Sequence, residues 1–81
     1  MPHYFFNSLL GGQKMLDLEG QCLPDLDAAR EEAIAGLRDI AADRVRSGEP
    51  LDLGDCVQIT DADSKPLLIV SLGEVLVAKG S

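Results

Sequence analysis

The chain has 81 residues, of which 46% are hydrophobic, and its 14 Asp and Glu residues against 7 Lys and Arg residues give a formal net charge of −7. This length predicts one small domain over residues 1–81, and the negative charge argues against direct binding to nucleic acid or to an anionic membrane. No apolar run approaches the roughly 18 residues of a membrane span, and the chain does not begin with a signal-peptide pattern. We therefore expect a cytoplasmic protein.

The first arm of the chain has the pattern of a β-hairpin. Residues His3–Leu10 are largely apolar, Gly11-Gly12 supplies a turn, and residues Gln13–Leu18 alternate in part. Successive residues of a strand point to opposite faces, so large rings lie on both faces of the first strand. Rings on both faces are explained if both faces of the sheet are covered, one of them by another subunit. The candidate interface residues for such a homodimer are Tyr4, Phe5 and Phe6.

The middle of the chain predicts one long helix. Asp25 is a favourable N-cap and Pro24 disfavours an earlier start, so the helix should begin at Leu26. Gly48 follows a basic last turn and should end it. Gly36, inside the helix, is either tolerated or marks the close approach of another backbone. Apolar residues recur at three- and four-residue steps, and the predicted buried stripe is Leu26, Ala29, Ala33, Leu37, Ile40, Ala41 and Val45.

The last part of the chain predicts two further strands. Cys56–Thr60 alternates, and the apolar run Leu67–Leu72 has the pattern of an inner strand. Residues 74–78 fit either a short edge strand or a helical turn. The order strand, strand, helix, strand, strand predicts an α+β fold with two layers, a mainly antiparallel sheet and one long helix packed on one face. A right-handed crossover through the helix would place the third strand beside the first, in the order 2-1-3-4.

No group of residues forms a recognised chemical site in the sequence. His3 is the only histidine, and as a general base it would need a nucleophile and an orienting acid within reach. Cys22 and Cys56 lack the spacing of a metal site, so we expect free thiols. Asp17 and Glu19 could form a carboxylate pair on one side of a strand, although solvated edge residues are the commoner explanation. We expect no catalytic residue, no metal and no cofactor.

Acidic residues concentrate in residues 17–32 and 49–63. These segments are either solvated loops or a surface for a basic protein partner. The residues proposed for such a surface are Asp17, Glu19, Asp27, Glu31, Asp52 and Asp55.

Four short motifs give the chain a resemblance to a known family: Pro2-x-Tyr4-Phe5-Phe6, Asp17-x-Glu19-Gly20, Leu23-Pro24-Asp25 and Ala28-Ala29-x-x-Glu32-Ala33. Over nearly the whole chain it resembles a family of small bacterial proteins catalogued as a domain of unknown function. Members carry His where this chain has Asn7, and often Gly where it has Ser64. The resemblance implies a cytoplasmic bacterial protein and supplies no activity or catalytic residue. A looser likeness, in element order alone, is to the partial RNase H-like domain of HicB-type antitoxins.

These observations favour a non-catalytic protein-interaction module that forms homodimers. One alternative is an antitoxin-like inhibitor whose acidic surface covers a small basic ribonuclease. A third hypothesis is an enzyme, which would need a pocket at a subunit interface because a two-layer domain of this size has little room for one.

Overall fold

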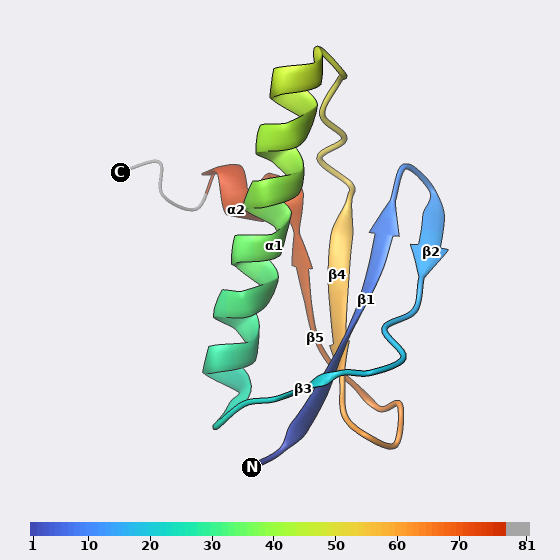
Figure 1. Cartoon of the computed structure of the whole chain (residues 1–81), viewed down its shortest axis with the longest axis vertical. Coiled ribbons are helices and arrows are strands. Elements are labelled where there is room, and N and C mark those ends of the chain that lie inside the picture. Colours follow the sequence, from blue (N-terminus) through green and yellow to red (C-terminus); the bar gives the residue numbers. More distant parts are fainter. Residues whose placement is uncertain (78–81) are drawn as a thin grey trace.

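The computed structural model describes residues 1–77, which form an antiparallel sheet with a long helix on one face (Figure 1). This confirms the predicted α+β fold of two layers. No helix in these residues is long and apolar enough to cross a membrane. The elements in chain order are β1 (His3–Leu10), β2 (Gln13–Met15), β3 (Gln21–Cys22), α1 (Leu26–Ser47), β4 (Cys56–Thr60), β5 (Pro66–Ser71) and α2 (Leu72–Val77).

Strand β1 is at the centre of the sheet and pairs antiparallel with β2, β3 and β4. Strand β5 pairs with the other side of β4, so the main strand order is β2-β1-β4-β5. This confirms the predicted order, in which the strand after the long helix lies beside the first strand. Strand β3 pairs only with His3 and Tyr4, at the start of β1.

The second strand is shorter than the sequence predicts. The prediction covered Gln13–Leu18, but β2 ends at Met15. Beyond it, side chains replace the backbone ladder: Oδ2 of Asp17 accepts from the backbone N–H of Phe6 at 3.1 Å, and Oδ1 of Asn7 accepts from the N–H of Asp17 at 3.0 Å. The chain then returns to β1 as the two-residue strand β3, which is too short for periodicity to reveal.

Helix α1 begins and ends where its capping residues predict. Oδ1 of Asp25 accepts from the N–H of Ala28 at 2.9 Å, which satisfies one of the free amides of the first turn. At the other end Gly48 has a φ of 74°, a left-handed conformation that glycine adopts without steric cost, and its N–H returns to the carbonyl of Val45.

The buried stripe of α1 is narrower than predicted. The fully buried residues recur every four positions and are Ala29, Ala33, Leu37 and Ala41. Val45, predicted to be buried, is 66% exposed because the last turn of α1 extends past the sheet. Gly36 is exposed, and a Cβ there would meet nothing within 4 Å. The helix therefore tolerates this glycine, and the close-approach alternative is wrong.

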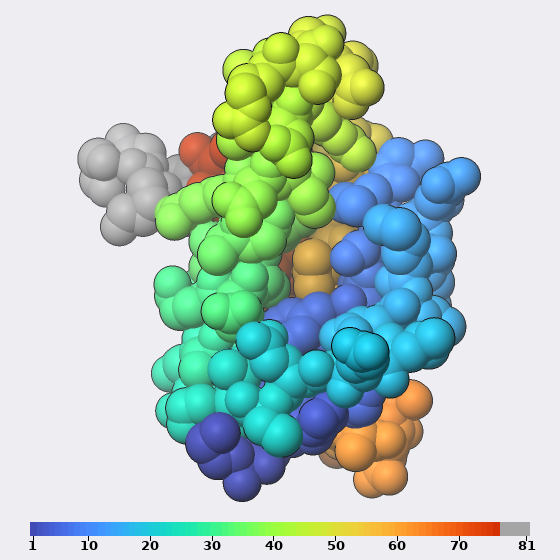
Figure 2. Space-filling model, viewed as in Figure 1, coloured from blue at the N-terminus to red at the C-terminus, as the bar shows by residue number. Residues whose placement is uncertain are grey.

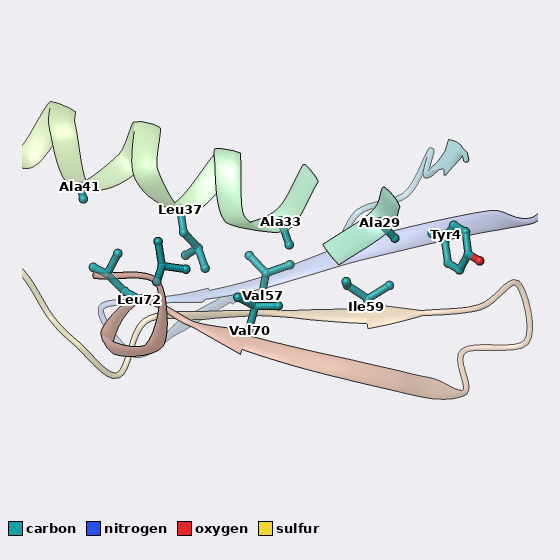
Figure 3. Close-up of a cluster of buried hydrophobic side chains, with 10 residues drawn as sticks. Tyr4, Ala29, Ala33, Leu37, Ala41, Val57, Ile59, Val70 and Leu72 are labelled. Atoms are coloured by element: carbon teal, nitrogen blue, oxygen red, sulfur yellow. The ribbon is translucent and has the colours of Figure 1, made fainter. Parts of the chain in front are cut away.

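The hydrophobic core lies in a single layer between α1 and the sheet (Figure 3). The small side chains of α1 face Val57 and Ile59 of β4, Val70 of β5 and Tyr4 of β1. Because three of the four buried residues of the helix are alanines, its backbone can approach the sheet closely. Helix α2 closes one end of this layer with Leu72, which is fully buried.

The C-terminal elements resolve one open alternative. Residues 74–77 belong to α2, so they form a helical turn and not an edge strand. Residue 78 lies outside the described residues. The predicted strand Leu67–Leu72 corresponds to β5, which runs from Pro66 to Ser71, and Leu72 already begins α2.

Asp55 has a buried side chain, and its side chain and backbone together bond to α1, the β1–β2 turn, the start of α2 and the loop before β4. The side chain of Asp55 is 2% exposed. Its Oδ2 accepts from a guanidinium nitrogen of Arg44, in the last turn of α1, at 2.6 Å, and its Oδ1 accepts from the N–H of Gly11, in the β1–β2 turn, at 2.9 Å. The backbone carbonyl of Asp55 accepts from the N–H of Leu72 at 2.7 Å, and its N–H donates to the carbonyl of Asp52.

The pairing of Asp55 predicts unequal effects for two arginines in the same helical turn. Arg44→Ala leaves a buried carboxylate without its cation and should lower the free energy of unfolding by about 3 kcal/mol. Arg46 pairs with Asp43, but those two side chains are 71% and 73% exposed, so Arg46→Ala should cost less than about 1 kcal/mol. Urea denaturation of both variants measures the difference, and equal losses would contradict the role of the buried pair.

Candidate functional site

No helix among residues 1–77 covers the sheet face opposite α1, which we call the open face (Figure 3). Strand alternation places on it every second residue of β1, β4 and β5. The pairing register aligns Asn7 of β1, Gln58 of β4 and Ile69 of β5 in one row across this face. Ile69 is 57% exposed and Leu9, further along β1, is 41% exposed.

Two shallow hollows lie on the open face, on either side of Asn7. One has a volume of about 260 Å³ and is lined by Phe5, Asn7, Leu16, Asp17, Leu18, Thr60, Ala62 and Ser64. The other has a volume of about 220 Å³ and is lined by Asn7, Ser8, Leu9, Lys14, Cys56, Gln58 and Ile69. Both are smaller than the roughly 300–1,000 Å³ of typical small-molecule sites.

Beside the first hollow, the carboxylate of Asp17 holds the β2–β3 linker against β1. Besides the N–H of Phe6, it accepts through Oδ1 from the N–H groups of Glu19 at 3.2 Å and Gly20 at 3.0 Å. After this linker the chain passes across the N-terminal end of β1 as β3 on the way to α1 (Figures 1 and 2). The side chain of Asp17 therefore takes the place of strand pairing in the stretch between β2 and β3.

The hydrogen bonds of Asp17 change its acidity. Partial burial by itself would raise the pKa of the carboxyl group, because it disfavours the charged form. The backbone N–H groups of Gly20, Phe6 and Glu19 stabilise the carboxylate, and the positive charge of His3 adds to them. The three hydrogen bonds and the charge of His3 together outweigh the effect of burial, so the pKa of Asp17 lies below its ordinary value of 3.8.

His3 and Cys22 lie next to each other at the start of the sheet. They are directly paired across β1 and β3, and Nδ1 of His3 is 3.1 Å from Sγ of Cys22. The other ring nitrogen, Nε2, is 2.7 Å from the backbone carbonyl oxygen of Glu19. Cys22 is exposed, whereas the other free thiol, Cys56, is half-buried on the open face.

The structure separates the three aromatic residues predicted for an interface. Tyr4 is 6% exposed and belongs to the core, and Phe6 packs against that core. Only Phe5 lies on the open face, where it lines the first hollow. The observed alternation is the predicted one, and the face that carries Tyr4 and Phe6 packs against α1.

The six acidic residues predicted for a binding surface divide into two groups. Three use their carboxylates within the fold, where they accept from backbone N–H groups: Asp17, Asp52 and Asp55. The other three, Glu19, Asp27 and Glu31, are exposed, and so is Asp52. Asp17 and Glu19 do not form a carboxylate pair, because the side chain of Asp17 binds the backbone of Glu19 and neither residue lies in a strand.

Sequence reasoning considered His3 and Cys22 separately and missed their contact. No periodic pattern could have revealed it, because it depends on the two-residue strand β3, whose pairing with the start of β1 brings them together. Among residues 1–77, no group of three or more His, Cys, Asp or Glu side chains is placed to hold a metal ion.

The fold and its open face define a small two-layer α+β domain with a single covered sheet face. The chain belongs to the family described as Domain of unknown function (DUF6894), whose profile matches residues 3–73. This span includes all the strands found in residues 1–77 and the whole of α1. Comparison with curated proteins and comparison with solved structures give no match.

The Asp17 carboxylate should make stability depend on acid pH. Asp17→Asn removes the charged acceptor and should lower the free energy of unfolding by about 1–3 kcal/mol at neutral pH. A lowered folded pKa contributes stability that is present above the unfolded value of 3.8 and is lost as the pH falls through the folded value. The difference between wild type and variant, measured by urea denaturation, should therefore shrink below pH 3.8. Glu19→Gln, an exposed control, should change stability little, and a pH-independent difference for Asp17→Asn would contradict the assignment.

Proposed function

We propose that the protein is a non-catalytic interaction module that forms a homodimer through its open face. The observation that carries this proposal is a set of exposed apolar side chains on a sheet face that no helix among residues 1–77 covers. Ile69 and Leu9 are exposed on it, and Leu16 and Leu18, beside the first hollow, are 63% and 85% exposed. Exposed apolar side chains gathered on one face favour an interaction site.

The charge distribution favours a second copy of this chain as the occupant. Two molecules with a net charge of −7 repel each other, so they should associate where carboxylates are fewest. The residues that line the two hollows include a single acidic residue, Asp17, whose carboxylate already accepts three backbone N–H bonds. Lys14 is the only basic residue in either lining.

The size of the open face suggests a dimer of modest affinity. The strands β2, β1, β4 and β5 have 3, 8, 5 and 6 residues. At about 3.3 Å per residue and about 4.8 Å between strands, they give a flat area of roughly 350 Å² per copy before side-chain relief is counted. Stable interfaces bury about 800 Å² per partner. We therefore expect association at micromolar protein concentrations. A two-fold axis across the face would bring the same apolar residues of both copies together.

The basic side chains support a protein partner over nucleic acid. Arg38, Arg44 and Arg46 are the nearest approach to a basic cluster in the sequence. In the structure the guanidinium of Arg44 pairs with the buried Asp55, and that of Arg46 bonds to Asp43. Few arginine charges on this helix are then available to neutralise phosphates.

Size-exclusion chromatography with light scattering tests the proposal. Wild type should be a dimer at about 100 μM, a concentration suited to a micromolar dimer. Leu9→Lys and Ile69→Lys each place a charge on the open face and should give folded monomers, as judged by circular dichroism. Val45→Lys is the matched control, because Val45 is as exposed but lies on α1, so this variant should remain dimeric.

The two variants also separate the open face from the free edge of the sheet. Strand β1 is paired on both sides, so Leu9 cannot take part in edge-to-edge pairing, whereas Ile69 lies on the edge strand β5. If only Ile69→Lys is monomeric, the contact is the β5 edge and the open-face proposal fails. A strictly monomeric wild type would contradict the homodimer altogether.

A further inference from the structure

The position of His3 fixes which of its nitrogens carries a proton. The backbone carbonyl of Glu19 can only accept, so Nε2, at 2.7 Å from that oxygen, must be the N–H donor. In the neutral ring Nδ1 is then the unprotonated nitrogen, and its neighbour at 3.1 Å is the thiol of Cys22. The thiol therefore donates to a base, and the base is oriented by a third group, which is the arrangement that activates nucleophiles.

The ring of His3 is held in this position by close packing. A Cβ on Gly20 would lie 2.6 Å from Cδ2 and Nε2 of His3 and 2.8 Å from the ring of Phe5, so a side chain there would collide with both rings. Gly20 also has a φ of 70°, which favours glycine. The ring of Phe5 lies 5.0 Å from that of His3 between centroids.

We propose that Cys22 and His3 form a nucleophilic thiol site that undergoes exchange with low-molecular-weight disulfides. The thiol proton moves to Nδ1 of His3 as the sulfur of Cys22 attacks one sulfur of R–S–S–R. The R–S–S–R bond breaks, a mixed disulfide forms on Cys22, and the leaving sulfur takes the proton from Nδ1 as R–SH. One disulfide and one thiol are consumed and one of each is formed, so no further oxidant is needed.

The position of the second cysteine limits what the site does next. Cys22 is opposite His3 and Cys56 is opposite Leu9. Leu9 is six positions along β1 from His3, or about 20 Å along a strand. A disulfide requires Cα atoms within about 7 Å, so Cys56 cannot release the mixed disulfide within one folded chain. The site therefore holds a reversible modification and does not act as a dithiol reductant.

The test compares the reaction rate of the Cys22 thiol in the folded protein with its rate in the protein unfolded by urea. In a Cys56→Ser background, stopped-flow absorbance follows the reaction of Cys22 with dithiodipyridine, an uncharged disulfide that the net charge of −7 does not repel. An exposed thiol without a base should react no faster in the folded protein than in urea. Activation by His3 predicts a reaction about tenfold or more faster in the folded protein, and equal or slower reaction would overturn the proposal.

Two variants identify the base and the site. His3→Asn keeps a polar side chain without an imidazole and should lose the folded-state acceleration, and a retained acceleration would overturn the role of His3. In a Cys22→Ser background the reaction reports Cys56, a half-buried thiol without a bonded base among residues 1–77, and it should show no acceleration. Mass spectrometry should locate the mixed disulfide on Cys22. The same rates are also measured in the Leu9→Lys variant, which should be monomeric, so that the result for the thiol does not depend on whether the protein forms a dimer.

Discussion

The buried carboxylate of Asp55 is the constraint on which this fold depends most. A buried charge is costly unless it is paired and hydrogen-bonded, and Asp55 meets that condition only when the last turn of α1, the β1–β2 turn and the start of β4 are all in place. The apolar layer is less selective. Its helical residues repeat every four positions, so a shift of α1 by one turn would again present small side chains to the sheet. The directional pair between Arg44 and Asp55 distinguishes the observed register from the shifted ones.

A second carboxylate, Asp17, has a corresponding role beside the middle of β1, where it binds the N–H of Phe6. Its carboxylate accepts from the backbone N–H groups of Phe6, Glu19 and Gly20, and so it fixes the linker between the end of β2 and the start of β3. Asp25, Asp52 and Asp61 likewise accept from backbone N–H groups at the helix start and in turns. Much of the acidity of the chain therefore stabilises a small domain, and the surface left for a basic partner is smaller than the composition suggests.

Membership of a family without an assigned function leaves the chemistry of the exposed surface as the guide to what this protein does. The open face and the thiol of Cys22 meet at Phe5, which lines the first hollow and also packs beside His3. A partner seated on the open face would therefore lie close to the His3–Cys22 pair. The likeness to HicB-type antitoxin domains stays a prediction.

The sequence predicted the features that depend on interactions within a few residues. These are the Asp25 and Gly48 caps of α1, the glycine turn after β1, the alternation of β4 and the continuous apolar run of β5. From these the element order and the strand order followed, because few topologies are compatible with one helix and short connections. Only the tertiary structure decided which face α1 covers, and hence that Tyr4 and Phe6 are core residues while Phe5 faces outward. It alone made Asp55 an internal ion pair and brought His3 to Cys22. These contacts join residues that are 11 and 19 positions apart, and no periodic pattern encodes a pairing that depends on where two separate elements meet.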